Sequence, residues 1–295
     1  MEKGKADRGP GITARLWDSS LIQNSASESL QIGQRSEMKG TITMKKLMIA
    51  AAAAFCATVS LAELASANIV GYTTTPIEGN KWYMIAPSFE NVGSAEATTV
   101  DLIKTLSISG VTVETWSNRA NATQIQVFNP ATGGYTLYYY TVNAGVTGWR
   151  RSPSVATELP IKVGTGVWLK VMSAESGANV TFAGQVRAAE TTVVKFGDEG
   201  TWTMVSNPYP TPLTQGKLVT TGITAQTWSN RASASQLQVF NPASGGYSIY
   251  YYTSGAGGNC WRNSPSAPSA DAVICPAGAS FWVKSSAEGT LTFSL

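Results

Sequence analysis

The sequence predicts an all-β protein built from two tandem, duplicated β-sandwich-like modules. The main observation is an internal repeat, because the segment 114–141 returns at 226–253 with 21 of 28 positions identical. Short runs of β-branched and aromatic residues also alternate with clusters of Gly, Pro, Asn and Ser, which is typical of short strands joined by turns. Each module has roughly 110 residues, which is long enough to bury a core of its own.

An export signal is predicted ahead of the modules. Residues 44–67 combine two lysines, an apolar run over 47–61 and a small-x-small cleavage site at 65–67, the three parts of a secretory signal peptide. The apolar run is shorter than the ~20 residues of a spanning helix. We therefore expect a secreted or cell-envelope protein with no membrane span after signal removal. Residues 1–43 are polar, and we interpret them as a non-native extension from a start codon assigned too early.

The mature chain, 68–295, carries few charges. Its 13 basic and 12 acidic residues leave a net charge near +1. Nucleic acid binding demands a basic face, so we expect no nucleic acid partner. A surface built from Ser, Thr, Asn, Gln, Gly and Tyr is instead common where secreted β-proteins meet neutral polymers or one another.

Several common catalytic and metal-binding arrangements are missing from the sequence. The chain has no histidine, which excludes a Ser-His-Asp or Cys-His nucleophile and any His-ligated metal. Glycosidases use two carboxylates, but the repeated segment keeps none because Glu114 becomes Gln226. No calcium loop or phosphate-binding loop is present. The sequence therefore predicts a protein that is not an enzyme and holds no cofactor or metal; an enzyme that uses residues of one module only is the alternative.

Further motifs set the module boundaries at 68–187 and 188–295. The segment 164–170 (GTGVWLK) returns at 278–284 (GASFWVK), in the same order relative to the long repeat. The first module is longer at 98–107, a stretch that predicts one short helix. Two prolines at the corresponding place in the second module predict that this helix is missing there.

The clearest single element is a hairpin in each module. In the first, 124–128 is one strand, 129–134 the turn and 135–141 the return strand. Side chains alternate between the faces of a strand, so one face is core and the other a mixed surface of Tyr and Gln. The candidates for ligand or interface contacts are Tyr138, Tyr140, Gln124 and Gln126, with Tyr250, Tyr252, Gln236 and Gln238 in the repeat.

Three roles for these tyrosines remain open from the sequence. Aromatic rings with amides suit sugar recognition, since rings stack on pyranose faces and amides bond the hydroxyls. The same strip suits a protein interface, where Tyr is enriched. The third possibility is a structural strand covered by a loop.

The mature chain has two cysteines, Cys260 and Cys275, both in the second module. Two cysteines that occur together in one copy of an exported repeat favour a disulfide. Two independent buried thiols are the alternative.

An ordered set of motifs gives the chain a family resemblance. The mature chain opens with NIVGY at 68–72, and each module carries an aromatic-x-Met strand, a QIQVFN or QLQVFN strand and a Gly-x-x-x-Trp-x-Lys strand. In this order they resemble the secreted, functionally uncharacterised β-repeat proteins of Verrucomicrobia-type bacteria and the wider β-repeats of bacterial surface proteins. The resemblance implies a secreted or envelope-associated protein and carries over no catalytic residue.

The sequence thus predicts a secreted, non-enzymatic structural or adhesive repeat protein of the cell surface or extracellular matrix. Its expected partners are a second copy of itself or an envelope protein, with the strand near 68–75 as the exposed sheet edge. The alternative is a carbohydrate-binding module protein that holds polysaccharide on the exposed Tyr and Gln strips.

Overall fold

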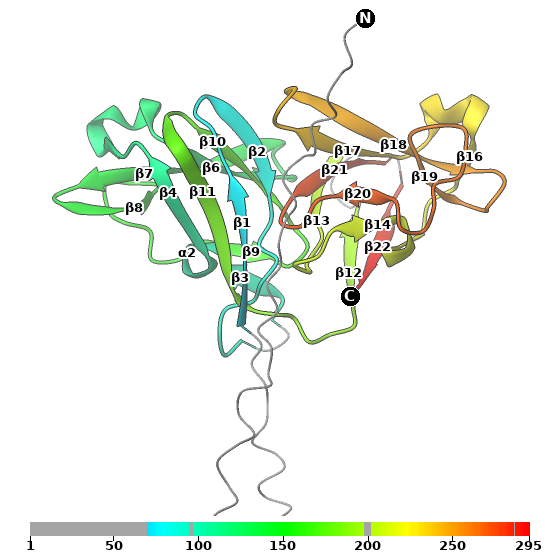
Figure 1. Cartoon of the computed structure of the whole chain (residues 1–295), viewed down its shortest axis with the longest axis horizontal. Coiled ribbons are helices and arrows are strands. Elements are labelled where there is room, and N and C mark those ends of the chain that lie inside the picture. Colours follow the sequence, from blue (N-terminus) through cyan, green and yellow to red (C-terminus); the bar gives the residue numbers. More distant parts are fainter. Residues whose placement is uncertain (1–69, 95–96, 198–201, 286) are drawn as a thin grey trace, which may run out of the picture. The chain divides into compact units, whose positions relative to one another are not determined.

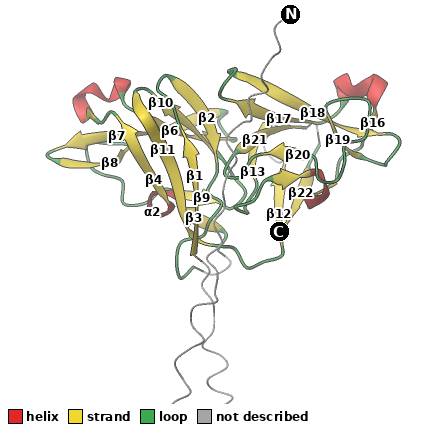
Figure 2. Ribbon diagram, viewed as in Figure 1, coloured by secondary structure: helices red, strands yellow, loops and turns green. Residues whose placement is uncertain are grey.

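Strand alternation in the two repeats builds two β-sandwich modules. The computed structural model describes residues 70–94, 97–197, 202–285 and 287–295, all within one compact unit, Asn68–Leu295. The interpretations of 1–43 and of the signal peptide at 44–67 fall outside these residues. Strands dominate the described part of the chain and the helical segments are short (Figure 2), which confirms the predicted all-β class.

The first module packs a three-stranded sheet against a larger one (Figure 1). The smaller sheet has the order β1 (Val70–Pro76), β11 (Ala174–Gln185), β4 (Leu106–Val111). The larger sheet has the order β2 (Lys81–Ile85), β10 (Val167–Val171), β6 (Gln124–Asn129), β7 (Gly134–Asn143), β5 (Glu114–Thr115), with β8 (Val146–Arg150) paired to β7. A small ribbon joins β3 (Thr99–Asp101) to β9 (Pro160–Lys162).

The second module repeats this topology strand for strand. Its smaller sheet has the order β12 (Thr191–Phe196), β22 (Gly289–Ser294), β15 (Leu218–Thr221). Its larger sheet has the order β13 (Trp202–Ser206), β21 (Ser280–Lys284), β17 (Gln236–Asn241), β18 (Gly246–Ser254), β16 (Gln226–Thr227), with β19 (Cys260–Arg262) paired to β18. The small ribbon joins β14 (Leu213–Thr214) to β20 (Val273–Cys275).

Each module has its own hydrophobic core between its two sheets. On β10 the alternate residues Val167, Leu169 and Val171 are buried in the first core, and Phe182 of β11 meets them from the other sheet. The second core repeats this arrangement with its own residues. We call the opposite side of each larger sheet its outer face; Trp168 and Lys170 lie there because side chains alternate along a strand.

The predicted helix at 98–107 is shorter than the sequence suggested. Only Leu102–Thr105 is α-helical (α2), with the Asp101 side chain accepting a hydrogen bond from the Ile103 N–H at 3.3 Å. Of the flanking residues, Thr99 and Val100 lie in β3, and Leu106 and Ser107 lie in β4. At the same place the second module has a three-residue 3₁₀ turn, η3 (Gln215–Lys217), so no α-helix forms there, as predicted. Among the described residues, no helix is long and apolar enough to cross a membrane.

The two modules join through their outer faces, and the contacts are reciprocal. Phe128 of the first module meets Trp282 of the second with ring centroids 4.9 Å apart, and Trp168 meets Phe240 at 5.0 Å. These four residues occupy equivalent positions in the two repeats. Together with Met84 and Met204 they form a third hydrophobic cluster shared by both modules. Such reciprocity is the signature of a two-fold interface, here realised within one chain.

Backbone hydrogen bonds follow the same reciprocity. The Ala86 N–H donates to the Gly278 carbonyl at 2.9 Å, and the Ser206 N–H donates to the Gly164 carbonyl at 2.8 Å. Ala86 and Ser206 are equivalent in the repeat alignment, as are the two glycines. The pseudo-two-fold relation therefore extends from the side chains to the main chain.

At one pair of equivalent positions the two residues contact each other, and they differ in identity. Gly166 and Ser280 align in the repeat, and a Cβ added to Gly166 would lie 2.2 Å from the Ser280 Cβ. The Ser280 hydroxyl is also 3.3 Å from the Ile85 carbonyl, to which it donates. The contact has room for one side chain only, so one module carries glycine where the other carries serine.

The predicted disulfide between Cys260 and Cys275 is wrong, because both are free thiols. The two residues belong to different sheets. Cys260 opens β19 and pairs with Thr253, and its Sγ accepts a hydrogen bond from the Arg262 Nε at 2.9 Å. Cys275 ends β20, pairs with Leu213 and is fully buried in the second core.

We expect Gly166→Ser to destabilise the protein by about 1–3 kcal/mol, the usual cost of forcing extra atoms into a packed contact. Urea unfolding measures this. The control is the swapped pair Gly166→Ser with Ser280→Gly, which keeps one side chain at the contact and should recover most of the loss. If the double variant is no more stable than Gly166→Ser alone, the one-side-chain contact does not explain the effect.

Burial raises the pKa of the Cys275 thiol from 9.0 to about 12. Between these values the unfolded chain releases the thiol proton and the folded chain keeps it, so the free energy of unfolding falls as pH rises, by up to about 1.4 kcal/mol per pH unit. Unfolding of the wild type and of Cys275→Ala between pH 9 and 11 measures this fall. The difference between the two proteins should shrink with pH; a constant difference would contradict a neutral buried thiol.

Candidate functional site

The outer face of each larger sheet carries a row of aromatic, amide and cationic side chains. Strand register in the first module places Trp82, Lys170, Gln124 and Tyr139 opposite one another on four successive strands. In the second module the register gives Trp202, Lys284, Gln236 and Tyr251 in the same order. The same row therefore occurs twice in the chain.

Contacts within the row hold the side chains in place. The Lys170 Nζ lies 5.3 Å from the Trp82 ring centroid, a distance at which a cation is attracted to the ring face. The Gln126 side chain donates to the Gln124 Oε1 at 3.3 Å. The row is thus ordered before anything binds to it.

The repeated Trp-Ser-Asn-Arg motif lies at the end of each row. In the first module it forms the short 3₁₀ segment η2 (Trp116–Asn121), where the Arg119 guanidinium lies 4.8 Å from the Trp116 ring centroid. Trp116 meets Tyr139 edge to face at 6.1 Å. The equivalent segment η4 (Trp228–Ser233) repeats both contacts, at 4.9 and 6.0 Å. The motif thus holds its own loop against the row, in agreement with the structural role that Ser, Asn and Arg favour there.

A pocket opens where the first row approaches the second module. Its volume is about 600 Å³, within the usual range for ligand pockets. The lining residues are Asn80, Lys81, Trp82, Gln126, Tyr135 and Trp168 of the first module with Phe240, Pro242, Ala243, Ser244, Gly245 and Tyr247 of the second. We call this site the aromatic pocket.

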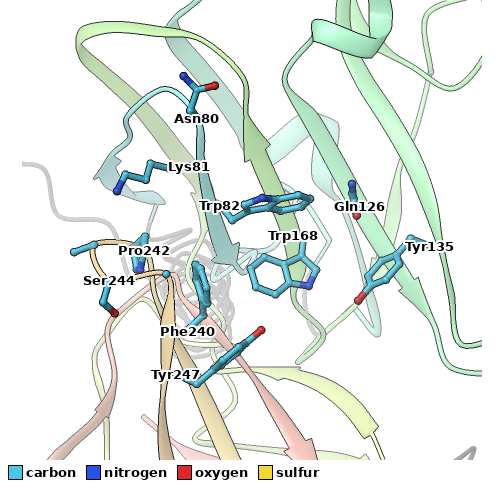
Figure 3. Close-up of a pocket in the computed structure, with 12 residues that line it drawn as sticks. Asn80, Lys81, Trp82, Gln126, Tyr135, Trp168, Phe240, Pro242, Ser244 and Tyr247 are labelled. Carbon is cyan, nitrogen blue, oxygen red and sulfur yellow. The ribbon is translucent and has the colours of Figure 1, made fainter.

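Five of the twelve lining residues are aromatic, and Figure 3 shows their rings. Trp82 and Trp168 lie one above the other, with ring centroids 5.7 Å apart and planes at 85°. Phe240 packs against Trp168 and against Tyr247, the latter at 5.3 Å. Such edge-to-face contacts fix the rings relative to one another, so the pocket presents a largely preformed aromatic surface.

The polar groups of the pocket are hydroxyls, amides and one lysine. Burial raises the pKa of Tyr135 and Tyr247, while side-chain hydrogen bonds from Trp168 and Trp282 partly offset the rise. Both phenols therefore stay neutral over the physiological range and can donate or accept hydrogen bonds. The twelve lining residues include no carboxylate.

The structure separates the tyrosines and glutamines that the sequence grouped as candidates. Tyr138 pairs with Ile125 on β6, and Tyr138 and Tyr140 pack against the first core. Gln124 and Gln126 lie on the outer face, Gln126 in the pocket wall. The second module repeats this division: Tyr250 and Tyr252 pack with the second core, and Gln236 and Gln238 lie on its outer face.

Sequence reasoning missed the pocket residues Trp82, Trp168, Phe240 and Tyr247. The hairpin did contain a signal, because a turn that pairs Phe128 with Tyr135 also places Gln124 opposite Tyr139, on the same face of the sheet. What the hairpin alone does not reveal is that Trp82 and Trp168, from strands far apart in sequence, complete that face. Phe240 and Tyr247 come from the other module altogether.

Alanine replacement of two neighbouring tyrosines of β18 should show which face of the sheet is buried in the core. Tyr252 is 7% exposed and its ring lies 5.0 Å from Trp261 in the second core, so Tyr252→Ala should cost about 3 kcal/mol. Tyr251→Ala, on the outer face, should cost about 1 kcal/mol, the order of its edge-to-face contact with Trp228. Thermal and urea unfolding measure both. Equal losses would contradict the assignment of the two faces.

Comparisons of the chain with protein-family models, with curated proteins and with solved structures found no match.

Proposed function

We propose that this chain is an exported, non-enzymatic protein that binds neutral polysaccharide in the aromatic pocket. One observation carries the proposal: ordered Trp, Tyr and Phe rings and neutral hydrogen-bonding groups, Gln126 above all, converge on one pocket of about 600 Å³.

The chemistry of a sugar ring matches this lining. The face of a pyranose presents C–H groups of slight positive charge, which pack on the negative face of an aromatic ring. Its edge presents hydroxyls, which an amide can meet as both donor and acceptor. Trp82 supplies a ring, Gln126 an amide and Tyr135 a hydroxyl. Specific pockets usually have a few oriented polar groups in an otherwise apolar wall.

The lining favours binding over hydrolysis. Glycoside hydrolysis uses two carboxyl groups across the scissile bond, and the described residues around the pocket supply neither. The low net charge of the mature chain also suits a neutral polymer, since no long-range field is needed to attract it.

The structural or adhesive role expected from the sequence stays a prediction. One feature favours it: among the residues that the structure describes, β1 is an edge strand paired with β11 alone, and its sequence, VGYTTTP, carries no charge. The equivalent edge strand β12 carries Lys195, a residue that discourages edge-to-edge pairing. Polysaccharide binding is compatible with such a role.

Affinity electrophoresis of the full chain tests the proposal on gels that contain cellulose derivatives, chitin derivatives, xylan, mannan, β-1,3-glucan or starch. We expect retardation by at least one polymer. Trp82→Ala should weaken binding by about 5- to 150-fold, since loss of a stacking ring costs about 1–3 kcal/mol in the analogous case of a nucleobase. Val219→Ala, an exposed change on β15 away from the pocket, is the matched control.

Two results would overturn the proposal. One is the absence of retardation by every polymer of the panel. The other is retardation that disappears in about 1 M NaCl, where the Debye length is about 3 Å, because such binding would be ionic and directed at a charged polymer.

A further inference from the structure

We infer that the chain carries a second polysaccharide site, related to the aromatic pocket by the pseudo-two-fold axis and built around Trp202, Trp282 and Phe128. The inference rests on the proposed function, because it assigns the same ligand class, neutral polysaccharide, to the second site. The repeat alignment alone does not require a second site. The second site follows from the reciprocal packing of the two modules.

The ring geometry of the first site recurs at the second. Trp202 and Trp282 meet edge to face at 6.0 Å and 85°, compared with 5.7 Å and 85° for Trp82 and Trp168. The Lys284 Nζ lies 5.6 Å from the Trp202 ring, compared with 5.3 Å for the Lys170–Trp82 pair.

The contribution from the other module also recurs. At the first site Phe240 of the second module packs on Trp168 at 5.0 Å; at the second site Phe128 of the first module packs on Trp282 at 4.9 Å. Each phenylalanine also packs against a tyrosine on the next strand. The Phe240–Tyr247 centroids are 5.3 Å apart and the Phe128–Tyr135 centroids 5.4 Å apart.

The turn that borders each site has the same sequence pattern and the same internal bond. The turn after β17 has the Ala243 N–H donating to the Asn241 Oδ1 at 2.9 Å, and the turn after β6 has the Ala131 N–H donating to the Asn129 Oδ1 at 3.1 Å. The former turn lines the aromatic pocket. Reciprocal packing places the latter beside Trp282, because Phe128 immediately precedes Asn129.

The amide and the exposed ring of the second site are likewise present. Gln238 donates to the Gln236 Oε1 at 2.9 Å, as Gln126 does to Gln124. Trp202 is 36% exposed, so its ring is open to a ligand. Tyr135 and Tyr247 are 40% and 43% exposed. Both phenols line the aromatic pocket, although they belong to different modules.

Two sites on one chain change how it would meet a polymer. Once one site is occupied, a second binding event on the same or a neighbouring polysaccharide strand proceeds at a high effective concentration, and avidity can exceed either single affinity by 10²–10⁴. A bivalent chain also cross-links strands. Duplication of the module then has a functional consequence beyond the doubling of the fold.

Native mass spectrometry of the full chain with cellohexaose, chitohexaose, xylohexaose, mannohexaose, laminarihexaose and maltohexaose tests the inference. For the sugar that binds, we expect two hexasaccharides per chain. Trp82→Ala and Trp202→Ala should each leave one, and the double variant none. Circular dichroism and thermal unfolding of each variant show that the fold is kept, and Val219→Ala is again the control that should leave two.

The outcomes separate the two proposals. One hexasaccharide per chain, lost in Trp82→Ala and unaffected in Trp202→Ala, overturns the second site and leaves polysaccharide binding at the first intact. Binding by none of the six sugars, together with no retardation by their polymers, overturns both. Two hexasaccharides that both survive in the double variant place binding elsewhere and also overturn both.

Discussion

The reciprocal packing of Phe128 on Trp282 and of Phe240 on Trp168 is the interaction on which the rest of this structure depends. It joins the outer faces of two β-sheets that would otherwise expose large aromatic residues to water. Each such pair contributes about 0.5–1.5 kcal/mol beyond the area it buries. The same rings that join the modules form the wall of the aromatic pocket, so the interface and the candidate site are one arrangement of side chains.

A duplicated sequence that packs on itself meets a constraint at its pseudo-axis. Positions far from the axis contact a different position of the other repeat and can stay identical, as the two phenylalanines and the two tryptophans do. A position on the axis contacts its own counterpart, and at one such pair there is no room for two side chains. Gly166 and Ser280 are the result. The difference between Gly166 and Ser280 is therefore a packing requirement, although in the sequence it resembles a random substitution.

Much of the fold followed from local rules. The Asn-Pro-Ala-x-Gly-Gly turn and the alternation of 124–141 predicted the hairpin of β6 and β7 with its two faces. The helix was overestimated because the β-branched Thr99 and Val100 at its start pair with β9, and Leu106 and Ser107 at its end pair with β11. The disulfide was predicted from composition and compartment, neither of which carries information on which sheet each cysteine joins.

The sequence by itself determined the class, the duplication and the period-two pattern of each strand, because these depend on neighbours within a few residues. The register that places Gln124 opposite Tyr139, and not beside Tyr138 and Tyr140, came from the structure. Only the tertiary structure decided which face is core, since that depends on what packs against the sheet: Tyr138 turned inward with Ile125, and Tyr139 outward. It alone brought Trp82 and Trp168 beside Phe240 and Tyr247, because contacts across the pseudo-axis join residues from different modules that no local pattern links.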